Sequence, residues 1–216
     1  PDGVRAALDL PARPEVTSSF TLPMRPPQLC QGCPHRDAYA AIGKALEGID
    51  DPLIAGDIGC YTLGALAPFN AIESCVCMGA SIGMAKGASD AGIKPALAII
   101  GDSTFMHSGI TSLLDAVAHD TDMTVIILDN GTVAMTGQQP SAMPPSRLEP
   151  LVLGTGVNPE HVKTVHTHPR KVDEFAAVLR AEVEHPGLSV VVAQRECIEA
   201  VRKDKAAAKR EKEARS

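Results

Sequence analysis

Aromatic side chains are scarce in this sequence, at 3% of its 216 residues, and tryptophan is absent. So few aromatic rings exclude a base-stacking platform for single-stranded nucleic acid. The formal net charge of −6 also argues against binding to a phosphate backbone. No apolar run approaches the roughly 20 residues that span a bilayer. We therefore expect neither nucleic acid nor a membrane among the partners.

An export signal and a disulfide framework are also missing. The first residues show no basic stretch followed by an apolar one, which predicts a cytoplasmic protein. Six cysteines are too few for a disulfide scaffold in a chain of this length. The close pairs Cys30/Cys33 and Cys75/Cys77 instead favour metal or redox chemistry, although we expect the second pair to be free buried thiols. Alone, the first pair is compatible with half a zinc site, half an iron–sulfur site or a redox pair.

Changes in composition divide the chain into three segments. Residues 1–28 are rich in proline, which breaks helices, so we predict an extended arm or linker. Residues 29–200 are predicted to form the folded domain. Residues 201–216 form a charged tail, in which seven basic and three acidic side chains over 202–216 predict a solvated helix or a frayed end.

Short apolar runs alternate with helix-forming segments throughout the middle segment. The apolar runs are 53–56, 96–100, 123–128 and 188–193, with a further strand expected at 162–166. Helices are expected at 37–47, 79–90, 108–119 and 171–184. Fully apolar strands alternating with helices are typical of a parallel sheet covered on both faces. The sequence therefore predicts an α/β fold, a parallel sheet with helices on both faces.

Two polar residues follow consecutive strands of this pattern. Asp102 comes after one apolar run, and Asn130 comes after the next, about one β-α-β unit later. Because ligands of such sheets bind at the carboxyl ends of the strands, we expect both side chains at one edge. A carboxylate, an amide oxygen and the Thr132 carbonyl suit Mg²⁺. Alone, Gly101-Asp102-Ser103 is a weak signal, and an ordinary turn with a helix N-cap explains it better than a metal ligand.

These motifs resemble a known family. Gly101-Asp102-Ser103 followed by 128–132 is similar to the thiamine diphosphate motif, Gly-Asp-Gly with a downstream Asn, although Ser103 replaces the usual third glycine. Residues 133–140 resemble the Met-Thr-Gly-Gly-Gln stretch of 2-oxoacid:ferredoxin oxidoreductases. Segments 29–36, 57–64 and 77–83 narrow the resemblance to the diphosphate-binding domain of the large (alpha) subunit of indolepyruvate ferredoxin oxidoreductases. The resemblance covers about residues 25–198.

The resemblance implies a cofactor site. Mg²⁺ would be held by Asp102, Asn130 and Thr132 and would bridge both phosphates of thiamine diphosphate. The other residues that the resemblance places at the cofactor are His35, Asp57, Gly59, Cys60, Gly101, Ser103, Thr104 and Thr136. His107 would face the reacting centre as a catalytic residue, or it is an ordinary surface or capping histidine.

The resemblance also gives a role to four cysteines. Family relatives hold a [4Fe–4S] cluster close to the thiamine, and Cys30, Cys33, Cys60 and Cys197 occupy the matching places here. Zinc or free thiols remain alternatives for these residues.

The implied activity needs more than this chain. It is oxidative decarboxylation of a 2-oxoacid, an arylpyruvate such as indolepyruvate, with coenzyme A and ferredoxin. The family's activating Glu comes from a pyrimidine-binding domain or subunit, and no Glu here matches its motif. We therefore expect an oligomeric enzyme with a shared site. The alternatives are a non-redox thiamine-dependent decarboxylase or synthase, and a non-catalytic, metal-stabilised interaction subunit.

Overall fold

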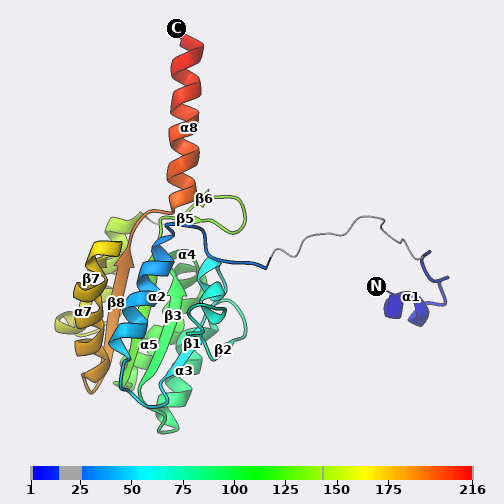
Figure 1. The fold of residues 1–216 in the computed structure, drawn as a ribbon. Helices are drawn as coiled ribbons and strands as arrows, with labels where there is room; N and C mark the ends of the chain where they lie inside the picture. The colour runs from blue at the N-terminus through cyan, green and yellow to red at the C-terminus, as the bar shows by residue number, and fades with distance from the viewer. Residues whose placement is uncertain (1, 15–25, 143, 216) are drawn as a thin grey trace.

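The computed structural model describes residues 2–14, 26–142 and 144–215 (Figure 1). Its centre is a six-stranded sheet in the order β2-β1-β3-β4-β8-β7, in which every pair of neighbours is parallel. The strands are β1 (Leu53–Gly56), β2 (Ser74–Cys75), β3 (Ala96–Gly101), β4 (Met123–Asp129), β7 (Val162–His166) and β8 (Leu188–Gln194). This arrangement confirms the predicted α/β fold, and the predicted strands agree with the observed ones to within about a residue.

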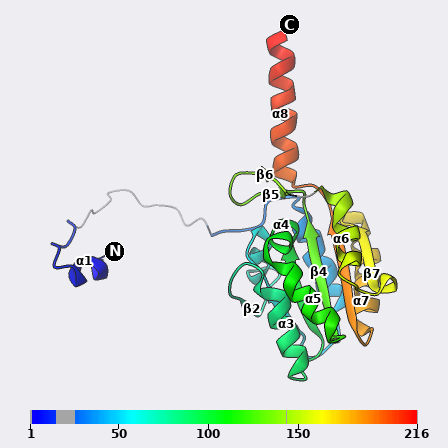
Figure 2. The ribbon, with the colours of Figure 1, turned by 180° about the vertical axis from the view of Figure 1, so that it is seen from behind.

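Helices cover both faces of the sheet. The helices are α1 (Asp2–Ala7), α2 (Pro34–Ala45), α3 (Ala80–Asp90), α4 (Asp102–Thr104), α5 (Ile110–Ala118), α6 (Leu148–Gly154), α7 (Val172–Glu184) and α8 (Ile198–Arg215). Figures 1 and 2 show α2 and α7 on one face and α3, α5 and α6 on the other. Strands β3 and β4 are buried along their whole length because both of their faces are covered.

The core is two apolar layers that share the strands. Along β3, Leu97 and Ile99 pack toward α2 and α7, whereas Ala98 and Ile100 pack toward α3 and α5. Successive strand residues point to opposite faces, so an unbroken apolar run supplies both layers. This explains why β3 and β4 lack the polar alternation of a strand with one wet face.

The register of the sheet brings the predicted turns together. Ala55 pairs with Ala98, and Gly101 pairs with Leu128, so β1, β3 and β4 end at the same edge. After β4 the chain forms a small hairpin, β5 (Thr132–Val133) with β6 (Gln139–Pro140), which sequence analysis did not predict. The expectation that Asp102 and Asn130 follow neighbouring strands is confirmed.

The two terminal segments differ in how well they were predicted. Within the described part of 1–28, residues 2–7 form helix α1, so the expectation of a wholly extended arm is wrong there. The reason is that α1 ends before Pro11, and residues 15–25 lie outside the described residues. At the other end, α8 projects away from the sheet (Figure 1) and is exposed from residue 202 to residue 213, which agrees with a solvated helix.

Within the described residues, no helix is both long enough and apolar enough to cross a membrane.

Candidate functional site

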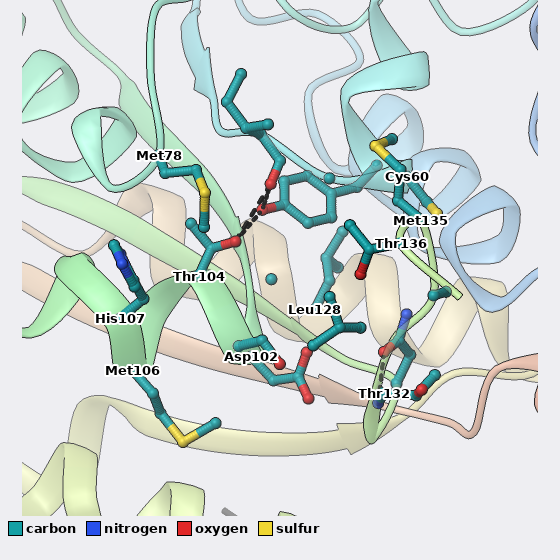
Figure 3. A pocket seen from close by; sticks show the side chains of 18 of the residues that line it. Cys60, Met78, Asp102, Thr104, Met106, His107, Leu128, Thr132, Met135 and Thr136 are labelled. Atoms are coloured by element: carbon teal, nitrogen blue, oxygen red, sulfur yellow. Dashed lines mark hydrogen bonds between the residues drawn. The ribbon is translucent and has the colours of Figure 1, made fainter. Parts of the chain in front are cut away.

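A cavity of about 480 Å³ opens at the carboxyl edge of the sheet, and we call it the main cavity (Figure 3). It collects residues from the ends of β1, β3 and β4 and from the hairpin. Nine of the eleven residues predicted to bind cofactor line it, together with His107: Gly59, Cys60, Gly101, Asp102, Ser103, Thr104, Asn130, Thr132 and Thr136. The two that do not line it are His35 and Asp57.

Asp102 lies at the start of α4, where β3 ends, and its side chain is 5% exposed. Its Oδ2 atom is buried and has no hydrogen-bond partner. Burial, with a smaller contribution from the nearby Asp129 carboxylate, raises the pKa of Asp102 from 3.8 to about 6. A buried carboxylate oxygen without a partner is costly unless it binds a cation. The orphaned oxygen therefore fits the donor set that Mg²⁺ prefers.

The turn after β4 presents Asn130 and Thr132 to the same cavity. The Asn130 Oδ1 atom accepts a hydrogen bond from the Thr132 backbone N–H at 3.1 Å, which folds the turn back on itself. Gly131 between them has φ +71°, a conformation that glycine adopts without strain. The turn thus holds an amide oxygen at the cavity, and one lone pair of that oxygen stays available for a cation.

Gly59 and Gly101 have no side chain, so their backbone itself lines the main cavity. A Cβ atom at Gly59 would lie 2.4 Å from the Tyr61 ring, and one at Gly101 would lie 2.5 Å from it. The Tyr61 hydroxyl donates to the Ile58 carbonyl oxygen at 2.9 Å and lies 3.2 Å from the Thr104 hydroxyl, the network drawn in Figure 3. Tyr61 therefore fixes the spacing of two glycine loops whose backbone can approach a diphosphate.

His107 is exposed at the mouth of the cavity, on a π-helical turn over Phe105–Gly109. In Figure 3, Asp102 lies between His107 and Thr132. The His107 Nδ1 atom lies 3.1 Å from the Ser108 hydroxyl, which in turn donates to the Met78 carbonyl oxygen. Single π-helical turns often mark functional positions because they redirect side chains. His107 therefore lies where it can contact a group bound in the main cavity.

Asp57 holds backbone segments together next to the site. Its carboxylate is fully buried and accepts three backbone N–H groups: Ile58 and Gly79 at 2.8 Å on Oδ1, and Ser81 at 3.1 Å on Oδ2. Gly79 precedes α3 with φ +86°, and a Cβ there would lie 2.2 Å from the Ser108 hydroxyl. Asp57 therefore ties the end of β1 to the start of α3, and it does not line the main cavity.

Replacing Asp57 by asparagine should lower the free energy of unfolding by about 2–3 kcal/mol, because the new NH₂ group would oppose a backbone N–H that needs an acceptor. Urea unfolding followed by circular dichroism measures the change. Asp51→Asn, at an exposed position, is the matched control and should change stability by less than about 0.5 kcal/mol. Equal stability of the two variants would contradict this role of Asp57.

A second cavity of about 160 Å³ adjoins the main one, and we call it the cysteine cavity. It is lined by Cys30, Cys33, Cys60 and Cys197, the four cysteines that the resemblance groups together. Cys60 and Asn130 line both cavities. Burial, with smaller contributions from the other three cysteines, raises the pKa of the Cys33 thiol to about 11. The Cys33 thiol therefore lies close enough to the other three for their ionisation to affect it.

In the described part of the chain, no three His, Cys, Asp or Glu side chains converge closely enough to hold a single metal ion. The cysteines surround a shared space instead of one point, which differs from the compact tetrahedral site of zinc. All six cysteines are free. Cys75 is half-buried and Cys77 is exposed, so the expectation that both are buried is wrong. Cys75 ends the two-residue strand β2, and the segment that follows it is exposed at Val76, Cys77 and Met78.

His35 lies between the two cavities. It is 3% exposed, it lines the cysteine cavity, and its Nε2 atom lies 3.3 Å from the Asn130 Nδ2 atom. Burial, with a smaller contribution from the positive charge of Arg195, lowers the pKa of His35 to about 4. The imidazole is therefore neutral near pH 7 and contacts a predicted metal ligand, not the space of the main cavity.

Sequence analysis missed several residues that shape the site. Met78, Met106 and Met135 supply apolar lining to the main cavity, and Ser141 hydrogen-bonds the Ser103 hydroxyl at 3.0 Å. Arg195 pairs with Asp37 at 2.5 Å and donates to the Gly32 carbonyl oxygen, which ties the end of β8 to the Cys30–Cys33 turn. No local motif marks these residues, because their roles depend on contacts far away in the chain.

The fold and the site define a thiamine diphosphate-binding domain. Residues 57–193 match the family model described as "Thiamine pyrophosphate enzyme, C-terminal TPP binding domain", and the chain belongs to that family. Among known structures, 2-oxoglutarate:ferredoxin oxidoreductase from Magnetococcus marinus is similar, with a TM-score of 0.68 and 19% identity over 80% of this chain and 65% of that one. A thiamine diphosphate-dependent 4-hydroxybenzoylformate decarboxylase from Rhodococcus jostii gives a TM-score of 0.57 at 17% identity, over 88% of this chain and 36% of that one.

More specific relatives carry the name indolepyruvate oxidoreductase subunit IorA. The protein of that name from Archaeoglobus fulgidus is 40% identical over 185 residues, 81% of this chain. The one from Methanothermobacter thermautotrophicus is 37% identical over 191 residues, 82% of this chain. The resemblance to the indolepyruvate branch is thereby confirmed. This chain spans only 29–30% of the length of these relatives.

Proposed function

We propose that this chain supplies the diphosphate- and Mg²⁺-binding half of the active site of a thiamine-dependent 2-oxoacid:ferredoxin oxidoreductase. The substrate would be an arylpyruvate such as indolepyruvate, oxidised with coenzyme A to an acyl-CoA and CO₂ while ferredoxin is reduced. The observation that carries the proposal is the buried, unpartnered Oδ2 atom of Asp102, a residue that lines the main cavity together with Asn130 and Thr132.

In this proposal the chain's own residues bind and orient the cofactor. Asp102, Asn130 and Thr132 would hold Mg²⁺, and the backbone at Gly59 and Gly101 would lie against the phosphates. When bound, thiamine diphosphate supplies a nucleophilic carbanion and an electron sink. Met78, Met106 and Met135 add apolar lining to the main cavity, and His107 at the mouth would donate a hydrogen bond to a substrate oxygen.

The cysteine cavity supports the redox half of the proposal. Cys30, Cys33, Cys60 and Cys197 would hold a [4Fe–4S] cluster, which accepts electrons one at a time. Because Cys60 lines both cavities, such a cluster would lie against the thiamine site. An electron acceptor at that place is what distinguishes oxidation from the simple decarboxylation of a non-redox relative.

The remaining parts of the enzyme would come from elsewhere. We propose that a pyrimidine-binding domain or subunit supplies the activating Glu, so that the working enzyme is an oligomer located in the cytoplasm. The charged segment 201–216 and the arm 1–28 would lie outside the cofactor-binding domain formed by residues 29–200.

The complete enzyme, assayed anaerobically with coenzyme A and ferredoxin, tests the proposal. Indolepyruvate should be turned over with a kcat/KM roughly 10-fold or more above that of pyruvate or 2-oxoglutarate, since an aryl group fills an apolar pocket that smaller acids leave empty. Turnover should require thiamine diphosphate and Mg²⁺. Release of CO₂ from an iron-free enzyme without reduction of ferredoxin would support a non-redox decarboxylase instead.

A further inference from the structure

The contact between His35 and Asn130 joins two segments that are 95 residues apart in sequence. Its polarity follows from the rest of the network. The Thr132 backbone N–H needs an acceptor and finds it in the Asn130 Oδ1 atom at 3.1 Å. The Asn130 Nδ2 group, which can only donate, therefore faces His35. The His35 Nε2 atom must then accept, so the imidazole carries its proton on Nδ1.

His35 is held rigidly enough to fix its neighbour. It lies in the first turn of α2, where Pro34 occupies the first helical position, and the Arg36 backbone N–H donates to the Cys33 carbonyl oxygen at 3.1 Å. The imidazole packs edge-on against the Tyr61 ring, with ring centroids 5.9 Å apart and planes at 87°. At 3% exposure no solvent competes for its nitrogen.

We infer that His35 is a positioning residue for the metal site, which turns the Asn130 amide so that its oxygen, and not its NH₂ group, is presented to the cation. This inference rests on the proposed binding of Mg²⁺ and thiamine diphosphate. An amide that flips by half a turn offers a cation two N–H donors and repels it. The hydrogen bond to His35 excludes the flipped state, because Oδ1 would then face an acceptor nitrogen.

The same contact ties the metal site to the cysteine turn. His35 follows Cys33 by two residues and lines the cysteine cavity, and the Asn130 carbonyl oxygen accepts from the Cys197 backbone N–H at 3.1 Å. Asn130 is therefore held from both sides by residues of the cysteine cavity. The geometry of the cation ligand depends on the packing of that cavity.

The test is the Mg²⁺ concentration that gives half-maximal binding of thiamine diphosphate to the complete enzyme, measured by titration calorimetry. His35→Leu removes the acceptor and should raise this concentration roughly 10-fold or more, the usual effect of losing an outer-shell partner of a metal site. His35→Gln restores an acceptor oxygen and should bring the value back toward that of the parent. If His35 had only a structural role, His35→Leu and His35→Gln would both have a lower melting temperature, and His35→Gln would not restore the Mg²⁺ concentration of the parent.

His35→Phe, which keeps the ring packed on Tyr61 but cannot accept, serves as a second variant if the leucine variant does not fold. His119→Leu, at an exposed position directly after the C-terminal end of α5, is the control and should match the parent. If the parent binds with Mg²⁺ and the leucine and phenylalanine variants bind equally well, the inference is wrong while the proposed function stands. If the parent itself binds no thiamine diphosphate, the proposed function and the inference both fail.

Discussion

Replacing Asp102 by asparagine is expected to weaken Mg²⁺-dependent binding of thiamine diphosphate by roughly 100-fold or more. The asparagine keeps the size of the side chain but removes the negative charge and the free oxygen that a cation would take. Even outer-shell partners of metal sites contribute about 10–100-fold to affinity, so a direct ligand should contribute at least as much. Equilibrium dialysis of the complete enzyme with and without Mg²⁺ measures the effect.

The same substitution should stabilise the protein without its cofactor. Burial raises the pKa of Asp102 from 3.8 to about 6, so the fold loses stability as the pH rises from about 4 through 6 and the carboxyl group ionises. Above pH 6 the buried charge costs about 2–3 kcal/mol, which the neutral asparagine avoids. The gain should therefore be largest near pH 8 and vanish below pH 4. If Asp102→Asn binds thiamine diphosphate more weakly and has a higher melting temperature, the Asp102 carboxylate serves binding and not stability.

Asp129→Asn is the matched control for Asp102. Asp129 is also buried and lies at the end of the neighbouring strand, but its carboxylate already accepts from the Gln194 side chain at 3.0 Å and the Gly131 backbone N–H at 3.2 Å. It does not line the main cavity. Burial also raises the pKa of Asp129, but its carboxylate has two hydrogen-bond donors, so this control should keep Mg²⁺-dependent binding and gain less stability than Asp102→Asn. Unchanged cofactor binding in Asp102→Asn would remove the basis of the proposed function.

Replacing Cys30 by serine is expected to lower the iron bound per chain by at least about half, because a [4Fe–4S] cluster with about four iron atoms is held by four thiolates. Anaerobic purification of the complete enzyme, followed by iron analysis and the broad visible absorption of the cluster, measures the loss. Cys30 is exposed and lies outside the main cavity, so the variant should fold and keep thiamine diphosphate. Reduction of ferredoxin should fall with the iron.

Cys77→Ser is the matched control for Cys30. Both residues are exposed, but Cys77 does not line the cysteine cavity. Its iron content should equal that of the parent. If Cys30→Ser and Cys77→Ser bind the same amount of iron per chain, the proposed cluster is contradicted. Free thiols are then the better interpretation of the cysteine cavity. A cluster-free parent that still oxidises its substrate would contradict it as well.

The sequence alone determined the sheet and the location of the site. Apolar runs such as 96–100 that alternate with helices indicate strands covered on both faces, and parallel strands joined by helices end at one edge. That rule was enough to bring Asp102 and Asn130 to one cavity, whereas the grouping of Cys30, Cys33 and Cys197 around another was expected only from the family resemblance. The alternation of apolar runs and helix-forming segments extends over many residues, so an error at a single position does not change the predicted fold.

Only the tertiary structure decided what individual side chains do. Asp57 binds backbone N–H groups up to 24 residues away, and His35 meets Asn130 across 95 residues. Tyr61 separates two glycine loops because its ring fills the space that their missing side chains leave. Such contacts depend on the packing of elements that are distant in the chain. A local pattern of residue types therefore carries no signal for them, and the orphaned oxygen of Asp102 becomes visible only when all of its neighbours are in place.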